Sequence, residues 1–190
     1  MWHIYFIMWL TGSWKGTLIK NLKNLNLEDI IFPLSYRTRE PRKGEIRWVD
    51  SHFISKEKFV TWINKGEFLE YATVHWTDYY GTKYKDVLEN WINLGKIVIK
   101  EIDILWLKKL RREKPELDSK YSTIFLNIPN SILEERIEAR WVFMCNEEFA
   151  RRKNSAIIEE EEISKICTFE IDATLSQELV VEKFLKIIKK

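Results

Sequence analysis

Apolar and polar positions fall into short blocks that predict strands and helices in alternation. The run His3–Met8 is almost wholly apolar, as in a buried strand, and Leu18–Leu25 then places apolar residues at helical spacing. Tyr79–Thr82 has the composition of a turn. This alternation predicts an α/β fold, a three-layer sandwich with a parallel core sheet and crossover helices. Similar patterns predict further strands at 68–74, 97–103, 121–128 and 168–171, and further helices at 56–65, 83–94, 132–163 and 177–188. On the strand at 97–103, Asp103 is expected on the same face as Glu101, two residues before it.

Length and charge narrow the class of protein. A chain of 190 residues is the size of one compact domain. Lys and Arg number 31 against 29 Asp and Glu, and the basic residues are spread out, so we expect no nucleic-acid partner. Cys145 and Cys167 make neither a disulfide framework nor a metal set, which favours the reduced cytoplasm. No segment has the length and apolarity of a membrane span, and no obligatory protein partner is evident.

The stretch between the first strand and the first helix has the spacing of a phosphate-binding loop. With glycine in place of Trp9 and Trp14 it would read G-L-T-G-S-G-K-G-T. That pattern wraps backbone N–H groups around the phosphates of a nucleotide and brings Lys15 to the β/γ oxygens. An indole at position 14 would instead occupy the space of the anion. The predicted ATP-binding residues are Trp9, Leu10, Thr11, Gly12, Ser13, Trp14, Lys15, Gly16 and Thr17, with Thr17 as the candidate Mg²⁺ ligand.

A second motif follows, and others come after it in order. Residues 35–45, Ser-Tyr-Arg-Thr-Arg-Glu-Pro-Arg-Lys-Gly-Glu, resemble the guanylate kinase signature S-x-x-T-R-x-P-R-x-G-E. The segments 53–59, 66–72, 79–82 and 101–103 are similar to later motifs of the same family, and the resemblance covers essentially the whole chain. It implies a P-loop kinase that transfers a phosphoryl group from MgATP to GMP. It further implies a core at 1–34, 95–133 and 158–190, a GMP-binding insertion at 35–94 and a helical lid at 134–157.

The resemblance also implies a role for each matching residue. Arg39, Arg42 and Tyr80 would bind the GMP phosphate, since guanidinium groups hold phosphate oxygens bidentately. Glu70 and Glu101 would recognise guanine, because a carboxylate accepts from both N1–H and the 2-amino group, which adenine cannot match. Three further residues complete the acceptor and metal side: Ser35 and Thr82 as hydroxyl contacts, and Asp103 as the acid near Lys15 and the metal. The catalytic cations would be Lys15 and the lid arginines Arg136, Arg140 and Arg152, which neutralise the transferring phosphoryl group.

Tryptophan stands where the family has glycine at six positions. These are Trp9, Trp14, Trp48, Trp76, Trp106 and Trp141, among 9 tryptophans and only 6 glycines in all. A chain of this length would ordinarily hold about 13 glycines, at about 7% of residues. We hypothesise that the natural protein has glycine at these positions and that UGA codons, read as Trp in some genetic codes and as Gly in others, explain the printed tryptophans. Ser51 is a separate departure, because the family has a phosphate-binding Tyr there and a Ser hydroxyl is too short to replace it.

Two other interpretations stay open. If the tryptophans are genuine, the chain is a guanylate kinase-like binding module without a working ATP site, and it recognises a phosphorylated ligand through Arg39, Arg42 and Tyr80. Ser51 raises the other interpretation, a kinase for a different phosphorylated acceptor. The presence of both Glu70 and Glu101 counts against it.

Overall fold

The computed structural model describes residues 3–10, 15–74, 77–89, 95–129, 131–132, 135 and 160–189. The chain divides into two compact units, which we describe separately. The first unit comprises 1–4, 29–100 and 105–121, and the second comprises 5–28, 101–104 and 122–190.

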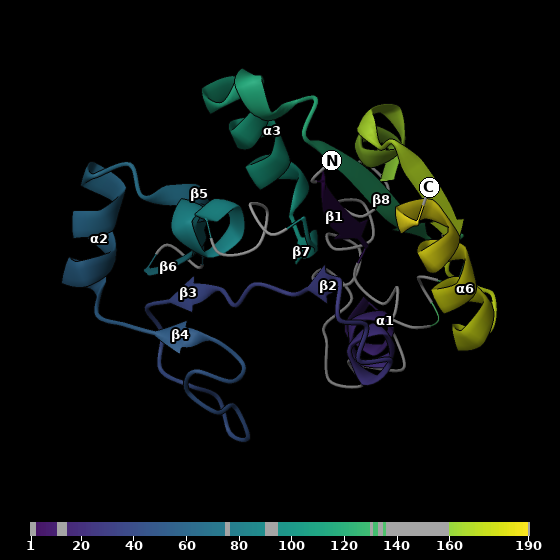
Figure 1. Ribbon diagram of the computed structural model, residues 1–190, viewed down its shortest axis with the longest axis horizontal. Coiled ribbons are helices and arrows are strands. Elements are labelled where there is room, and N and C mark those ends of the chain that lie inside the picture. The colour runs from purple at the N-terminus through teal and green to yellow at the C-terminus, as the bar shows by residue number, and fades with distance from the viewer. Residues whose placement is uncertain are drawn as a thin grey trace. The chain divides into compact units, whose positions relative to one another are not determined.

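Strands and helices alternate along the described residues, as the sequence predicts (Figure 1). The strands are β1 His3–Trp9, β2 Ile30–Ile31, β3 Tyr36–Arg37, β4 His52–Phe53, β5 Phe68–Val74, β6 Asp78–Lys83, β7 Ile97–Glu101, β8 Tyr121–Asn127 and β9 Phe169–Asp172. The helices are α1 Lys15–Asn24, α2 Lys56–Asn64, α3 Ile104–Glu113 and α6 Gln177–Ile188, with a π-helical turn at Lys85–Glu89 and a 3₁₀ turn at Pro115–Leu117. A five-stranded core sheet contains β1, β2, β7, β8 and β9.

The first unit holds a four-stranded sheet in the order β4-β3-β6-β5. β6 runs antiparallel to both β3 and β5, whereas β3 and β4 are parallel. α2 lies beside these strands (Figure 1) and begins where the Ser55 hydroxyl accepts from the Lys58 N–H. Phe59 of this helix stacks on Phe68 of β5, with ring centroids 4.2 Å apart. The same unit holds the parallel pair β2–β7, in the register Ile30↔Ile97.

The second unit is built on buried strands with almost continuous apolar runs. β8 pairs in parallel with β9, in the register Phe125↔Glu170. Near-continuous apolar runs are typical of parallel strands covered on both faces, and Phe6, Ile124 and Phe125 are fully buried. Helices α1 and α6 of this unit are joined by a hydrogen bond from Asn21 Nδ2 to Gln177 Oε1, 3.3 Å. The α/β fold with parallel pairing in the core sheet is thus confirmed.

Two local predictions are wrong, and a third is covered only in part by the described residues. Tyr79–Thr82 is part of strand β6, not a turn. The helix expected at 83–94 is helical at 84–89, with a π-helical turn at Lys85–Glu89, and residues 90–94 lie outside the described part. Strand β7 ends at Glu101, so Asp103 is beyond the strand rather than on its face, because α3 begins at Ile104. Most of the helix expected at 132–163 lies outside the described residues.

No helix among the described residues combines the length and the apolarity needed to cross a membrane.

Candidate functional site

The predicted ATP-binding residues begin at the end of β1 and continue into α1. β1 ends at Trp9 and α1 begins at Lys15, as the phosphate-loop pattern requires. The Leu10 side chain is fully buried, so only its backbone remains to line a nucleotide site. Gly16 and Thr17 lie in the first turn of α1, where backbone N–H groups and the helix dipole favour anions.

Lys15 contacts Glu101 and Trp9, both in the second unit. Its Nζ donates to Glu101 Oε2 at 3.0 Å and lies 3.3 Å from the centroid of the Trp9 ring. Glu101 reaches this place because β7 ends there and the next N–H, that of Ile102, donates to the carbonyl of Ile7 in β1 at 3.1 Å. An acid beside the phosphate-loop lysine is therefore present, and it is Glu101.

The sequence assigns different roles to two neighbouring acids, and these roles stay predictions. The sequence predicts Asp103 beside Lys15 and Glu101 at the guanine base. Glu101 contacts Lys15 in the structure, while Asp103 follows the strand and is exposed. Among the described residues no group of three His, Cys, Asp or Glu side chains is arranged to hold a metal ion. Mg²⁺ in a kinase usually takes only one or two protein ligands beside phosphates and water, so a single hydroxyl such as that of Thr17 fits this mode of binding.

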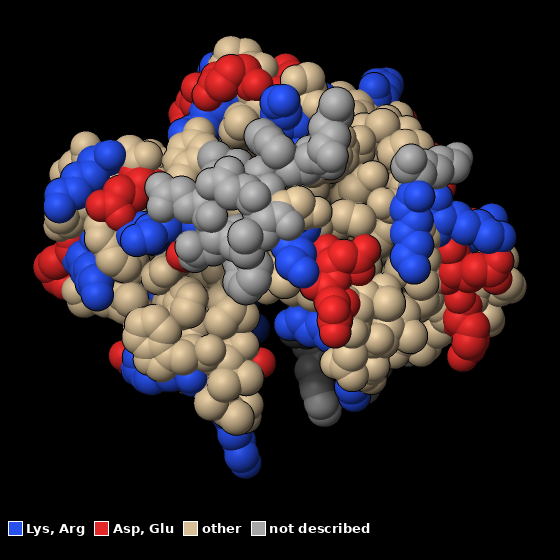
Figure 2. All heavy atoms as spheres, viewed as in Figure 1, with Lys and Arg blue, Asp and Glu red and all other residues tan. Residues whose placement is uncertain are grey.

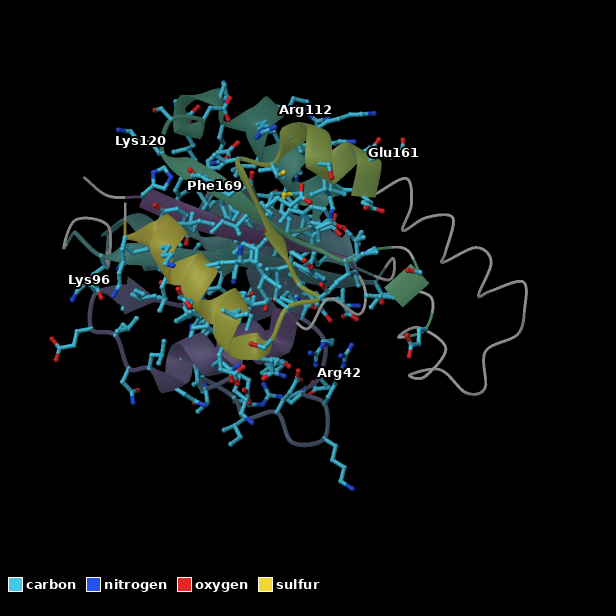
Figure 3. The ribbon with its side chains drawn as sticks, turned by 90° about the vertical axis from the view of Figure 1, so that its right-hand side faces the viewer. Arg42, Lys96, Arg112, Lys120, Glu161 and Phe169 are labelled. Atoms are coloured by element: carbon cyan, nitrogen blue, oxygen red, sulfur yellow. The ribbon has the colours of Figure 1, made fainter. Side chains whose placement is uncertain are left out.

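The acceptor-phosphate residues meet around one carboxylate in the first unit. Arg39 donates to both oxygens of Glu45, at 2.6 and 2.7 Å, and through Nε to the Tyr80 hydroxyl at 2.7 Å. The backbone N–H of Arg42 donates to Glu45 Oε2 at 2.7 Å. The Arg39 guanidinium and the Arg42 N–H lower the pKa of Glu45 to about 2. The loop therefore holds Arg39 in a fixed orientation with Tyr80 beside it, and leaves the side chain of Arg42 exposed (Figure 3).

Glu70 is a buried carboxylate in the same unit. Its side chain projects from β5, and Oε1 accepts from the Thr82 hydroxyl of β6 at 2.6 Å. Oε2 is buried and finds no hydrogen-bond partner among the described residues. Burial raises the pKa of Glu70, and the nearby charge of Lys100 acts in the opposite direction. Since a buried polar atom normally has a partner, Oε2 marks a position where a ligand donor would be satisfied.

Two residues of this site were not predicted from the sequence. Lys100 donates to the Ser35 hydroxyl at 2.7 Å and to the Pro33 carbonyl at 3.2 Å, so it joins the predicted Ser35 to β7. Glu45 is part of the matched signature, but its hydrogen bonds with Arg39 were not predicted. A lone lysine in the apolar run Ile97–Lys100 is the signal that could have identified the first.

Ser51 does not substitute for the missing tyrosine. Its side chain is fully buried, and its hydroxyl donates to the carbonyl of Asp50 at 2.6 Å. Next to it, the ring of His52 lies 4.8 Å from that of Trp48 and 4.5 Å from that of Tyr36. Burial lowers the pKa of His52. The imidazole therefore favours its neutral form, which is a poor substitute for a phosphate-binding cation.

Several predicted residues lie outside the described part of the chain. These are the loop residues Thr11, Gly12, Ser13 and Trp14, the lid arginines Arg136, Arg140 and Arg152, and the tryptophans Trp76 and Trp141. Their roles remain predictions from the sequence.

Comparison with known proteins gives one family. The family model described as Guanylate kinase matches residues 7–177. The guanylate kinase of Wolinella succinogenes is 38% identical over 131 residues, covering 68% of this chain and 58% of the relative. That of Helicobacter pylori strain 26695 is 39% identical over 131 residues, covering 68% and 60%. The chain thus spans about three fifths of the length of these curated relatives.

A solved structure agrees in fold. The crystal structure of guanylate kinase from Anaplasma phagocytophilum superposes with a TM-score of 0.68 and covers 98% of this chain and 84% of that one. Its sequence identity is 24%, so this likeness shows the fold, that of P-loop kinases, and no more.

Proposed function

The chain belongs to the guanylate kinase family, and from this premise we propose that it transfers a phosphoryl group from ATP to GMP, giving ADP and GDP. One observation of the structure carries the choice of acceptor. Glu70 presents a buried carboxylate oxygen without a partner among the described residues, next to the Thr82 hydroxyl. Guanine offers two adjacent donors, N1–H and the 2-amino group, that such a carboxylate accepts. Adenine has no donor at either position, so it would leave Glu70 unsatisfied.

The phosphate of GMP would bind at the pair Arg39 and Tyr80. Arg39 is already oriented by Glu45, so little side-chain entropy is lost when phosphate arrives. Its remaining N–H and the Tyr80 hydroxyl offer donors to phosphate oxygens, and the exposed Arg42 adds a second guanidinium. In this proposal both the base of GMP, at Glu70, and its phosphate, at Arg39 and Tyr80, bind residues of the first unit.

ATP would bind on the second unit, at the segment from Trp9 to Thr17. Lys15 would exchange its contact with Glu101 for the β/γ phosphates, and the N–H groups of the first turn of α1 would face the same anion. Mg²⁺ would be held by ATP together with the Thr17 hydroxyl, with Asp103 as the proposed acid near it. Bound there, the ion supplies charge neutralisation between the β- and γ-phosphates.

The chemistry needs no nucleophile from the protein. A GMP phosphate oxygen forms the new bond to the γ-phosphorus of ATP, the bond from that phosphorus to the β–γ bridging oxygen breaks, and ADP leaves with that oxygen. Charge spreads over the equatorial oxygens of the group in transfer, and fixed cations stabilise it. We assign that stabilisation to Lys15 and to the lid arginines Arg136, Arg140 and Arg152.

The proposal also assigns segments of the chain to a core, a GMP-binding insertion and a lid, and it includes a location in the cell. We propose the core at 1–34, 95–133 and 158–190, the GMP-binding insertion at 35–94, the lid at 134–157 and a cytoplasmic location. The four-stranded sheet formed by β3 to β6, with Arg39, Glu70 and Tyr80, falls inside the proposed insertion, which supports its assignment to GMP.

Steady-state assays with MgATP test the activity. In a version carrying Trp9→Gly and Trp14→Gly, we expect phosphorylation of GMP, with kcat/KM for GMP exceeding that for AMP by ~10²-fold or more, since a site built to accept hydrogen bonds rejects a base without the donors. Lys15→Ala in this version should lower kcat by ~10²-fold or more, because it removes charge stabilisation during transfer. Equal rates with GMP and AMP would contradict the role of Glu70.

The parent chain supplies the comparison with the binding-module interpretation. If the parent and the double-glycine version both bind GMP and neither transfers phosphate from ATP, the chain is a binding module. If only the double-glycine version is active, the indoles are what block the donor site.

A further inference from the structure

Strand β3 stops pairing with β6 just before Arg39, the residue proposed to bind phosphate. The last pair in the antiparallel register is Arg37↔Tyr80, so Thr38 would face Tyr79 if the two strands continued. Facing residues of an antiparallel pair alternate between exchanging two backbone hydrogen bonds and exchanging none. The first bond of such an exchange is present here, because the Thr38 N–H donates to the Tyr79 carbonyl at 3.1 Å.

A side chain provides the acceptor for the second bond. The Tyr79 N–H donates to the Thr38 hydroxyl at 2.8 Å, where a continuing strand would offer the Thr38 carbonyl. A hydroxyl can donate as well as accept, and this one donates to Asp78 Oδ1 at 3.3 Å. Thr38 therefore satisfies the backbone of β6 without keeping its own carbonyl in the sheet, and the chain can leave β3 at this residue.

The end of the pairing determines which residue Arg39 meets. In the continued register Arg39 would lie opposite Asp78, and opposite charges on facing strands attract each other. In the structure Arg39 instead donates through Nε to the Tyr80 hydroxyl at 2.7 Å, and through Nη1 and Nη2 to Glu45 at 2.6 and 2.7 Å. The acid that Arg39 would have faced accepts a hydrogen bond from Thr38.

We propose that Thr38 is a positioning residue of the acceptor-phosphate site: its hydroxyl ends the β3–β6 pairing and thereby directs Arg39 to Tyr80 rather than to Asp78. The inference deepens the proposed function and rests on it only for the identity of the ligand, the phosphate of GMP. Without the hydroxyl, the Tyr79 N–H would pair with the Thr38 carbonyl as in a continuing strand, because a backbone donor requires an acceptor. Arg39 would then be drawn toward Asp78 and away from the phosphate.

Two substitutions separate the hydroxyl from the rest of the Thr38 side chain. Thr38→Val keeps the branched shape and removes the hydroxyl, whereas Thr38→Ser keeps the hydroxyl and removes the methyl group. Thr61→Val is the matched control, because it makes the same chemical change in α2, where the hydroxyl donates to the Glu57 carbonyl of its own helix at 2.8 Å. Arg39→Lys removes the planar guanidinium through which Thr38 is proposed to act.

The first measurement needs no nucleotide. The ¹⁵Nε–H signal of Arg39 is assigned with Arg39→Lys, and its exchange with water is followed by NMR, because an N–H held in a hydrogen bond is protected from exchange. We expect slow exchange in the parent, in Thr38→Ser and in Thr61→Val. In Thr38→Val the exchange should be about tenfold faster, as the loss of one hydrogen bond implies.

The second measurement compares GMP with guanosine, which has the same base and no phosphate, by NMR titration of the chain as printed. Thr38→Val should weaken the binding of GMP about tenfold, because hydrogen bonds to a charged group contribute at least that much to affinity. It should leave the binding of guanosine unchanged, since the base is bound elsewhere in the proposal. In the Arg39→Lys background it should weaken GMP binding no further, because two changes to one contact are not additive.

Equal weakening of GMP and guanosine by Thr38→Val overturns the inference, because only a general structural defect affects both. Equal Nε–H exchange in the parent and in folded Thr38→Val also overturns it. Should Thr38→Val fail to fold, Thr38→Ala gives the same comparison with a smaller side chain, and fast exchange of the Arg39 Nε–H in the parent alone overturns the inference. A chain that shows the expected exchange but binds neither GMP nor guanosine contradicts the proposed function alone.

Discussion

At the scale of single residues, two tryptophans occupy opposite environments. Trp48 has a backbone φ of +67° and is 62% exposed. That conformation favours glycine and is an outlier for a bulky side chain. Trp62 lies in α2 with its ring edge-on to Tyr36 at 5.2 Å and the Lys83 ammonium 3.8 Å from its centroid. The backbone conformation at position 48 is one that glycine adopts easily, which supports the hypothesis that glycine is the natural residue there. At position 62 the indole ring packs against its neighbours, so tryptophan fits that position.

The backbone at position 48 leads to a stability prediction. Trp48→Gly should raise the free energy of unfolding by about 1 kcal/mol, because the left-handed conformation costs an L-residue about 1–2 kcal/mol and glycine gives back part of that gain as chain entropy. Urea denaturation of the two chains measures the difference.

Trp62→Gly is the contrasting substitution. It should lower the free energy of unfolding by about 4 kcal/mol, since it removes a packed ring and places glycine in a helix. The gene provides a parallel test, with UGA expected at position 48 and UGG at position 62. A destabilised Trp48→Gly chain, or UGG at both positions, would count against glycine as the natural residue 48.

The candidate site was predictable as a set of residue types but not as a set of contacts. The matched motifs identified Arg39, Tyr80, Glu70 and Thr82, and the structure joins them in pairs. The contact between Lys15 and Glu101 was not predicted, because sequence order does not say which side chain at the end of a strand will reach the loop. Lys100 was missed because no local motif contains it.

At the scale of elements, the strand pair β5–β6 explains Gly81, which the local sequence pattern had placed in a turn. Gly81 sits opposite Tyr71 in the antiparallel register. A Cβ at this position would lie 2.8 Å from the Glu70 carbonyl oxygen and 2.9 Å from the Tyr71 Cβ. The close approach of two strands requires glycine here, and no turn is involved.

A methyl group at this position should therefore be costly. Gly81→Ala is expected to lower the free energy of unfolding by about 2 kcal/mol, because the added atom overlaps backbone that cannot move without disturbing the sheet. Gly16→Ala is the matched control, since a Cβ there meets nothing within 4 Å and alanine is the better helix former. Urea unfolding of both variants decides the matter, and equal stability of the two would contradict the close contact.

The strongest periodicities predicted their elements well, and weaker ones did not. β5 and α6 have the predicted bounds, and β1, α1, α2 and β8 differ from prediction by a few residues at their ends. β6 was taken for a turn because Gly81 and two tyrosines resemble turn composition. β3 and β4 have two residues each, which is too short for an alternation of apolar and polar residues to be recognised. Their existence depends on pairing partners far along the chain.

At the scale of the whole molecule, charge is evenly mixed. Blue and red side chains are interspersed on the face shown in Figure 2, in keeping with a formal net charge of +2. Ligand binding must then come from local arrangements rather than from a general field. The acceptor residues Arg39, Glu70 and Tyr80 belong to the first unit, and the donor residues Trp9, Lys15 and Glu101 belong to the second.

This separation predicts unequal nucleotide binding by the chain as printed. GMP should bind weakly, because the tryptophans that intrude on a nucleotide site are mainly on the phosphate-loop side. A non-hydrolysable ATP analogue should bind hardly at all, because the Trp9 ring covers Lys15 and Trp14 stands in the phosphate loop. Isothermal titration calorimetry with each ligand alone measures both affinities, with the double-glycine version as the control that should recover the analogue. Tight binding of the analogue to the parent would show that the loop accommodates the indole.

The glycine between β5 and β6 has a consequence for how relatives of this chain are sorted. Selection will retain a glycine that two strands demand in every descendant that keeps this sheet, including descendants that have lost the reaction. A search for this glycine alone would therefore recover relatives that keep the reaction together with relatives that have lost it. The residues on either side of that glycine separate the two groups better, because Tyr80 and Thr82 carry hydroxyls whose hydrogen bonds to Arg39 and Glu70 belong to the proposed acceptor site.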